Sequence, residues 1–314
     1  MNVTAERMPR VLSYLIFSAL LLIVVFAHLG PALLAGLFCY TIADVTARNL
    51  SKRLSPRLAK WISLLILPLA VALLGGVFWF FIRQTLATVP GILDELLPKL
   101  TRLSDKYGFS LPFENIDELR EVVLAHVRKN AGAITHASGL LTKQLFHIII
   151  GIFIATLCFI SEHSDQYGPN MYDSLRREFS LRISGFMRDF ERVLGAQVLI
   201  SAINAVLSAL FLIAMGFPHI SFLPSAAFIL GLLPIVGNIL SNTIIVSAGL
   251  TMSLHHGLSA LCFLVIIHKA EYFFNSRIIG ASMRMPMWQT LLGIMIGEVI
   301  LGVPGLILAP AMIA

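Results

Sequence analysis

The chain has 314 residues, of which 57% are hydrophobic and 13% are charged. Soluble domains are about 45–50% apolar and about 25% charged, so this composition excludes an ordinary water-soluble globular protein. The net charge of +6 is spread over several loops, whereas a nucleic-acid surface needs a concentrated basic patch. We therefore expect a protein of the lipid bilayer that does not bind nucleic acid.

Six apolar stretches are long enough to cross a hydrocarbon layer of about 30 Å as helices. They lie at 11–27, 29–45, 61–82, 144–160, 193–215 and 256–275. Arg7 and Arg10 precede the first stretch, as in a signal peptide, but a second stretch follows almost directly, which favours an uncleaved first helix. The sequence predicts an all-α polytopic transmembrane bundle of about six to eight spans.

Basic residues indicate the orientation of the chain in the membrane. The segment 46–60 contains no acidic residue and five basic ones, Arg48, Lys52, Arg53, Arg57 and Lys60. Because loops rich in lysine and arginine stay inside, this loop and the N-terminus are expected to be cytoplasmic. The third span then places residues 83–143 outside, and we expect a bacterial cytoplasmic (inner) membrane protein.

The external segment 83–143 has the pattern of an amphipathic helical arm. Val89, Leu93, Leu96, Leu100 and Leu103 recur at alternating spacings of four and three, which is typical of an amphipathic or coiled-coil helix. A second helix is predicted at 115–135. The arm either forms an oligomer contact or lies on the lipid interface or on its own bundle.

Three regions follow from these elements. N-terminal transmembrane helices occupy 1–82, the extracytoplasmic arm occupies 83–143, and a transmembrane permease core occupies 144–314. The core includes a cytoplasmic loop at 161–192, which carries five arginines mixed with acidic residues.

Two long apolar segments are interrupted near their middle by proline and glycine. The first, 222–252, would make a straight helix of about 46 Å, too long for one span and too short for two. The second runs from residue 288 to the end of the sequence. We predict that both break at mid-membrane depth, as re-entrant or kinked helices, and paired broken helices point to a transporter's binding site. The predicted hinges are Pro234, Gly237, Gly302, Pro304 and Gly305.

A polar stripe follows the fifth span. Gln197, Ser201, Asn204 and Ser208 are spaced at i, i+4, i+7 and i+11, so they share one face of a helix. The stripe is either the wall of a translocation pathway or a set of hydrogen bonds between helices.

The first break places two amides, Asn238 and Asn242, beside backbone that leaves the helix. Freed carbonyls and amides in a broken helix can coordinate a cation or a polar solute. A simple proline kink at Pro234 is the alternative interpretation.

Two carboxylates lie in apolar sequence, where ionisable groups are costly and usually mark ion or proton pathways. Glu298 has no basic residue nearby and is the sharper candidate for proton or cation coupling. Glu271 follows His268 by three residues and precedes Asn275 by four, and it either takes part in the pathway or pairs with Lys269 or Arg277. The predicted pathway residues are Glu298, Glu271, Asn238, Asn242, Asn204, Gln197 and Ser201.

The sequence contains no sign of an enzyme, a cofactor or a metal site. Cys39, Cys158 and Cys262 are far apart in apolar segments, and no nucleotide-binding loop or nucleophile–base pair is apparent. Without an ATPase domain, active transport would have to use an ion gradient.

Four motifs in order resemble the autoinducer-2 exporter (AI-2E) family of bacterial permease-like proteins. The first motif, 192–197, opens the fifth span, and that span ends in Met215-Gly216-Phe217-Pro218. The third motif is Asn275-Ser276-Arg277-Ile278-Ile279-Gly280, with Pro286 beyond it. The second and fourth coincide with the breaks, Gly231-Leu232-Leu233-Pro234-Ile235-Val236-Gly237 and Leu301-Gly302-Val303-Pro304-Gly305-Leu306-Ile307-Leu308-Ala309-Pro310. The chain has Asn238 at the position, directly after the second motif, where the family often has a proline.

The resemblance implies a helical permease of the cytoplasmic membrane that assembles as a homo-oligomer, with pentamers among relatives. It also implies export of small solutes, autoinducer-2 in some members, and sodium–proton exchange in others. We therefore expect an exporter of a small polar solute, such as an autoinducer-2-like signal or a related metabolite, that uses an ion gradient. A sodium(cation)/proton antiporter and a non-transporting oligomeric membrane scaffold are the alternatives.

Overall fold

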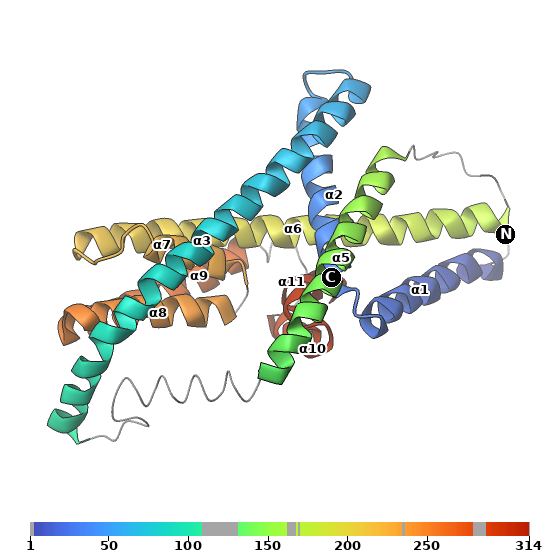
Figure 1. Cartoon of the computed structure of the whole chain (residues 1–314). Helices are drawn as coiled ribbons and strands as arrows, with labels where there is room; N and C mark the ends of the chain where they lie inside the picture. The colour runs from blue at the N-terminus through green and yellow to red at the C-terminus, as the bar shows by residue number, and fades with distance from the viewer. Residues whose placement is uncertain are drawn as a thin grey trace. The chain divides into compact units, whose positions relative to one another are not determined.

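The computed structural model describes residues 3–108, 131–161, 168, 170–233, 236–278 and 287–313. All regular structure in these ranges is helical, which confirms the all-α prediction. The helices (Figure 1) are α1 (Val3–Phe26), α2 (Gly30–Leu50), α3 (Pro56–Tyr107), α5 (Ala131–Ile160), α6 (Met171–Ala214), α7 (Leu223–Gly231), α8 (Val236–Met252), α9 (Leu254–Ile278), α10 (Met287–Leu301) and α11 (Val303–Ile313).

The described residues include five helical segments that are long and apolar enough to cross a membrane. They are Met8–Phe26, Gly30–Leu50, Pro56–Lys106, Lys143–Ile160 and Met171–Ala214, and each contains most of one predicted span. The sixth predicted span, 256–275, lies within α9. Shorter apolar helices form the two predicted broken segments. The protein is therefore a multi-pass membrane protein.

Large apolar side chains on these helices are exposed. Leu65 and Leu69 on α3 are 76% and 70% exposed, and Phe26 at the end of α1 is 79% exposed. Soluble monomers rarely expose contiguous apolar patches of more than a few hundred Å². Hydrocarbon tails, in contrast, are a good solvent for such side chains, so this exposure fits helices that face lipid.

Two helices are much longer than a membrane is thick. The 52 residues of α3 correspond to about 78 Å, so the helix continues without interruption past residue 82 into the predicted arm. The 44-residue α6 likewise begins at Met171, inside the predicted loop at 161–192. Most of the second predicted arm helix, 115–135, lies outside the described residues.

The described helices belong to two compact units. The first comprises residues 1–73, 142–195 and 282–314, and the second comprises residues 74–141 and 196–281. The first unit therefore contains α1, α2, α10 and α11, and the second contains α7, α8 and α9. The long helices α3, α5 and α6 contribute to both.

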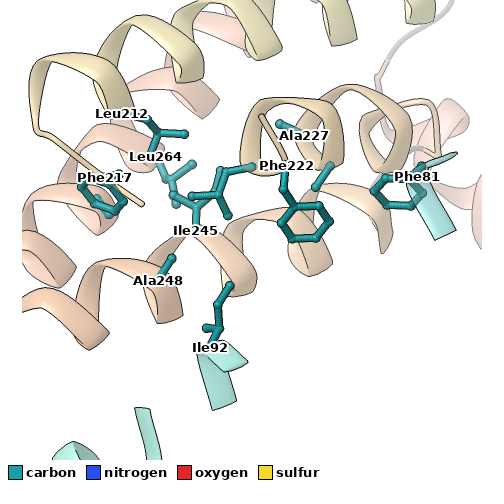
Figure 2. Close-up of a cluster of buried hydrophobic side chains, with 12 residues drawn as sticks. Phe81, Ile92, Leu212, Phe217, Phe222, Ala227, Ile245, Ala248 and Leu264 are labelled. Atoms are coloured by element: carbon teal, nitrogen blue, oxygen red, sulfur yellow. The ribbon is translucent and has the colours of Figure 1, made fainter. Parts of the chain in front are cut away.

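The second unit has an apolar core at the meeting of five helices. Figure 2 shows Phe81 of α3 beside Phe222 at the start of α7, with Ile245 of α8 and Leu264 of α9 close to Leu212 of α6. Ile92 of α3 belongs to the same cluster, with Val89 packed against it. This part of the predicted arm therefore packs on its own unit, while Leu93 on the same helix is 39% exposed.

In the first unit, α10 and α11 form a tight helical hairpin. Gly302 makes the turn between them with a φ of +65°, a conformation that glycine adopts without steric cost. The helices meet at Gly297 and Gly305, where a Cβ on Gly305 would overlap the carbonyl oxygen of Gly297. Such small-residue contacts let helix backbones approach closely in membranes.

We predict that replacing Gly305 with alanine separates α10 from α11. The added Cβ meets backbone, which cannot rotate away as a side chain could, and overpacking of this kind costs about 1–3 kcal/mol. Thermal unfolding of the full chain in detergent should show a lower midpoint.

Gly75→Ala on α3 is the matched control, because a Cβ at Gly75 meets nothing within 4 Å. Alanine in place of glycine in a helix stabilises it by up to about 1 kcal/mol. An unchanged midpoint for Gly305→Ala would contradict the close contact.

Candidate functional site

The first broken segment is divided between two helices, α7, which ends at Gly231, and α8, which begins at Val236. The amide of Leu233 donates a hydrogen bond of 2.8 Å to the carbonyl of Leu230. A Cβ on Gly237 would overlap that same Leu230 carbonyl. Glycine therefore lets the first turn of α8 lie directly against the last turn of α7. Pro234, predicted as a hinge, lies outside the described residues.

The polar stripe of α6 faces the interior of the second unit. Ser201, Asn204 and Ser208 are 1%, 9% and 2% exposed. The Nε2 of Gln197 donates a 2.6 Å hydrogen bond to the carbonyl of Gly231. The stripe therefore reaches the helix end at the break and caps one of its carbonyls.

Glu271 of α9 is the centre of a polar cluster. Its carboxylate lies 3.0 Å from Nδ1 of His268, and Nδ2 of Asn238 donates to its two oxygens at 3.1 and 3.3 Å. Asn204 of the stripe also interacts with this carboxylate. The Glu271 side chain is 12% exposed, so α6, α8 and α9 together enclose a carboxylate.

The imidazole of His268 connects Glu271 to a second amide. Its Nε2 lies 2.5 Å from Nδ2 of Asn242 on α8. Since a neutral imidazole has one donor and one acceptor nitrogen, Nδ1–H donates to Glu271 and Nε2 accepts from Asn242. A proton added to Nε2 would place two donors together, so Asn242 would have to present its carbonyl oxygen instead. The cluster therefore has two hydrogen-bonding arrangements that differ by one proton.

The structure brings together six of the seven predicted pathway residues. Gln197, Ser201, Asn204, Asn238, Asn242 and Glu271 all lie in the second unit. Asn238, Asn242 and Glu271 form the cluster around His268. His268 is not among the predicted pathway residues, although its spacing of three residues from Glu271 on a helix could have included it. The capped carbonyl of Gly231 has no sequence signal, because it depends on where α7 ends.

The remaining predicted partners have different positions. Glu298 belongs to the first unit and is exposed on α10, so its place in one pathway with Asn238 and Asn204 stays a prediction. Lys269 is exposed, and the partner that the structure gives Glu271 is His268 rather than Lys269. The side chains of Asn275 and Arg277 lie outside the described set.

Comparison with known proteins agrees with this architecture. The family described as AI-2E family transporter matches residues 12–314, a range that includes α6 and both broken segments. A relative from Bacillus subtilis (strain 168), named "Putative transport protein YdbI", is 26% identical over 261 residues. The match covers 79% of this chain and 72% of the relative. The helical membrane architecture and the family match lead to one conclusion: the chain belongs to the AI-2E family of transporters.

Proposed function

We propose that this membrane protein exports a small polar solute by using a proton gradient, and that Glu271 and His268 carry the coupling proton. The observation that supports this most directly is the enclosed carboxylate, 12% exposed and 3.0 Å from an imidazole nitrogen. Ionisable groups inside membrane helices are rare and usually belong to ion or proton pathways. Histidine, in addition, changes charge near neutral pH.

The coupling follows from the position of Asn238. This residue lies in the first turn of α8, directly after the break, and its amide donates to Glu271. Protonation of the carboxylate weakens a hydrogen bond to the charged form, which releases the start of α8 from α9. The segment then has two conformations, one with the start of α8 held on α9 and one with it released. A proton that binds one conformation more tightly than the other shifts the equilibrium between them.

The polar stripe of α6 supplies the wall along which a solute would move. Gln197, Ser201 and Asn204 offer amide and hydroxyl groups in the C-terminal, otherwise apolar half of α6. They are suited to neutral polar groups because none of them is charged. This is why the proposal names a small polar solute rather than an apolar one.

The proposal includes an orientation and an assembly. The turn between α2 and α3 carries Lys52 and Arg53, both exposed, and the positive-inside bias supports a cytoplasmic position for it and for the N-terminus. The bacterial inner membrane and a homo-oligomer are the location and assembly that the family resemblance supports.

We predict that Glu271→Gln uncouples transport. The full-length protein in liposomes would first be screened for uptake of small polar solutes, including autoinducer-2. For a solute found in this way, proton-driven accumulation should fall at least tenfold in Glu271→Gln, since the amide cannot bind the proton. Exchange of the solute across the membrane without a gradient should continue, because the pathway remains.

Two other carboxylates serve as comparisons for this experiment. Glu298→Gln tests the residue that the sequence favoured, and Glu95→Gln removes an exposed carboxylate of α3. Normal coupling in Glu271→Gln, with coupling lost in Glu298→Gln, would move the proton site to α10. If the wild-type protein also transports no solute, the result would favour the alternative of a non-transporting membrane scaffold.

We predict that His268→Gln makes transport less dependent on pH, because the imidazole that contacts Glu271 and Asn242 can bind a proton and the glutamine amide cannot. Glutamine keeps a polar side chain next to Glu271 but cannot change its charge. Initial rates measured with the same internal and external pH would show this. His255→Gln is the control on the same helix, because His255 is exposed at the start of α9. A pH profile that stays as steep as in the wild type would remove His268 from the coupling mechanism.

A further inference from the structure

The turn between α2 and α3 carries three basic side chains that make no ion pair within the described part of the chain. Lys52, Arg53 and Arg57 are all exposed, and none of them pairs with a described carboxylate. Lys52 donates to the neutral amide oxygen of Asn49 at 3.1 Å. Because the segment 46–60 has no acidic residue of its own, three positive charges lie close together in sequence without a counter-charge beside them.

The other two basic residues of this segment hold helices together. Arg48 Nη2 donates to both carboxylate oxygens of Glu191 on α6, at 2.6 and 2.7 Å. Lys60 Nζ donates to the carbonyl of Ile160, at the end of α5, at 2.7 Å, and it lies 5.9 Å from the centre of the Phe159 ring. Packing between helices thus accounts for Arg48 and Lys60, and it leaves the three side chains of the turn available for a ligand.

Backbone hydrogen bonds define the shape of the turn. The amides of Arg53 and Leu54 both donate to the carbonyl of Leu50, the last residue of α2, at 3.0 and 2.9 Å. Helix α3 then begins at Pro56, which places Arg57 in its first turn. Arg53 and Arg57 therefore extend from ordered backbone, so that binding a ligand requires only their side chains to become ordered.

An exposed apolar stripe on α3 continues from the basic turn. It consists of Leu58, Trp61, Leu65 and Leu69. At 3.6 residues per turn these four positions and Arg57 fall within an arc of about 120°. Exposed apolar side chains on a membrane span face hydrocarbon, and tryptophan is enriched at the boundary between hydrocarbon and headgroups. The stripe therefore leads from the lipid-facing side of α3 to the guanidinium of Arg57.

The combination of free cations and a lipid-facing stripe favours a phospholipid as the ligand. Guanidinium groups bind phosphate through two parallel N–H donors. A soluble phosphate ion would meet the charges but gain nothing from the stripe. An acidic protein partner that approached from water would likewise leave the stripe uncovered. A phospholipid with net negative charge matches both features, because its phosphate lies at the headgroup level and its acyl chains extend into the hydrocarbon.

We propose that Lys52, Arg53 and Arg57 bind the headgroup of an anionic phospholipid whose acyl chain lies along residues 58–69 of α3. The bound lipid anchors the turn between α2 and α3 at the membrane surface. All of these residues belong to the first unit, so the site is separate from the Glu271 cluster and does not rest on the proposed proton coupling.

Tryptophan fluorescence can identify the lipids beside this face. Trp61 and Trp79 are 62% and 64% exposed on the same helix, so lipid reaches both. Trp79 has a single exposed cation one turn away, Arg83, whereas Trp61 follows the three of the turn. Full-length proteins that retain one of these two tryptophans, with Trp288→Phe in both, would be reconstituted in phosphatidylcholine vesicles. The vesicles would contain brominated phosphatidylglycerol or brominated phosphatidylcholine at the same mole fraction, because bromine quenches tryptophan on contact.

We expect stronger quenching of Trp61 by the anionic lipid than by the zwitterionic one. Each basic residue near a charged membrane surface favours an anionic lipid roughly fivefold, so the preference at Trp61 should exceed that at Trp79 by about fivefold or more. Arg53→Gln together with Arg57→Gln should lower the preference at Trp61 to that at Trp79. Arg53→Lys with Arg57→Lys keeps both charges and should keep most of the preference.

The matched control removes two charges from another exposed part of the same unit. Arg177 and Arg188 are exposed on α6, and each has an acidic neighbour in sequence, Glu178 and Asp189. Arg177→Gln with Arg188→Gln changes the net charge by the same amount as the double substitution in the turn. It should leave the preference at Trp61 unchanged.

Three results would overturn the proposal. The first is an equal lipid preference at Trp61 and Trp79. The second is a loss of the Trp61 preference in the α6 control that matches the loss in the turn variant, since net charge alone would then explain it. The third is relief of the quenching by inorganic phosphate but not by chloride of the same ionic strength, which would assign the site to a soluble anion. No transport is measured here, so failure of the lipid site and failure of proton coupling can be told apart.

Discussion

Lipid offers no hydrogen bonds, and this constraint governs how the chain is built. A backbone that leaves the helix at membrane depth must be covered by protein or by a polar cavity. At the break between α7 and α8, Gln197 of α6 meets the Gly231 carbonyl at 2.6 Å. The polar stripe thus supplies a hydrogen bond to the break, which explains why polar side chains lie in the otherwise apolar C-terminal half of α6.

Glycine determines how closely these elements pack. Gly237 brings the start of α8 onto the carbonyl of Leu230, and Gly297 and Gly305 bring α10 onto α11. Helices in lipid gain little from hydrophobic burial between themselves, so close backbone packing and polar contacts contribute more to their association. Both broken segments use this solution, and within the described part of the chain the first also encloses the Glu271 carboxylate.

Much of the fold and part of the site could be predicted from the sequence. Periodicity was sufficient to put Gln197, Ser201 and Asn204 on one face of a helix, and proline and glycine marked both interruptions. The contact of Glu271 with Asn238 was beyond reach, because Asn238 is 33 residues away and meets it only through the packing of α8 on α9. The isolation of Glu298 in the sequence suggested importance, but spacing cannot tell which helices a side chain will meet.

The interruption after α7 also determines a distance. Residues 231 and 238 are seven apart, so in an unbroken helix they would lie two turns, or about 10 Å, from each other along the axis. The break instead brings Oδ1 of Asn238 to within 3.7 Å of the Cβ position of Gly231. Straightening this segment would therefore move Asn238 away from Gly231. The approach of the Asn238 amide to the end of α7 therefore requires the broken form, in which the same amide donates to Glu271.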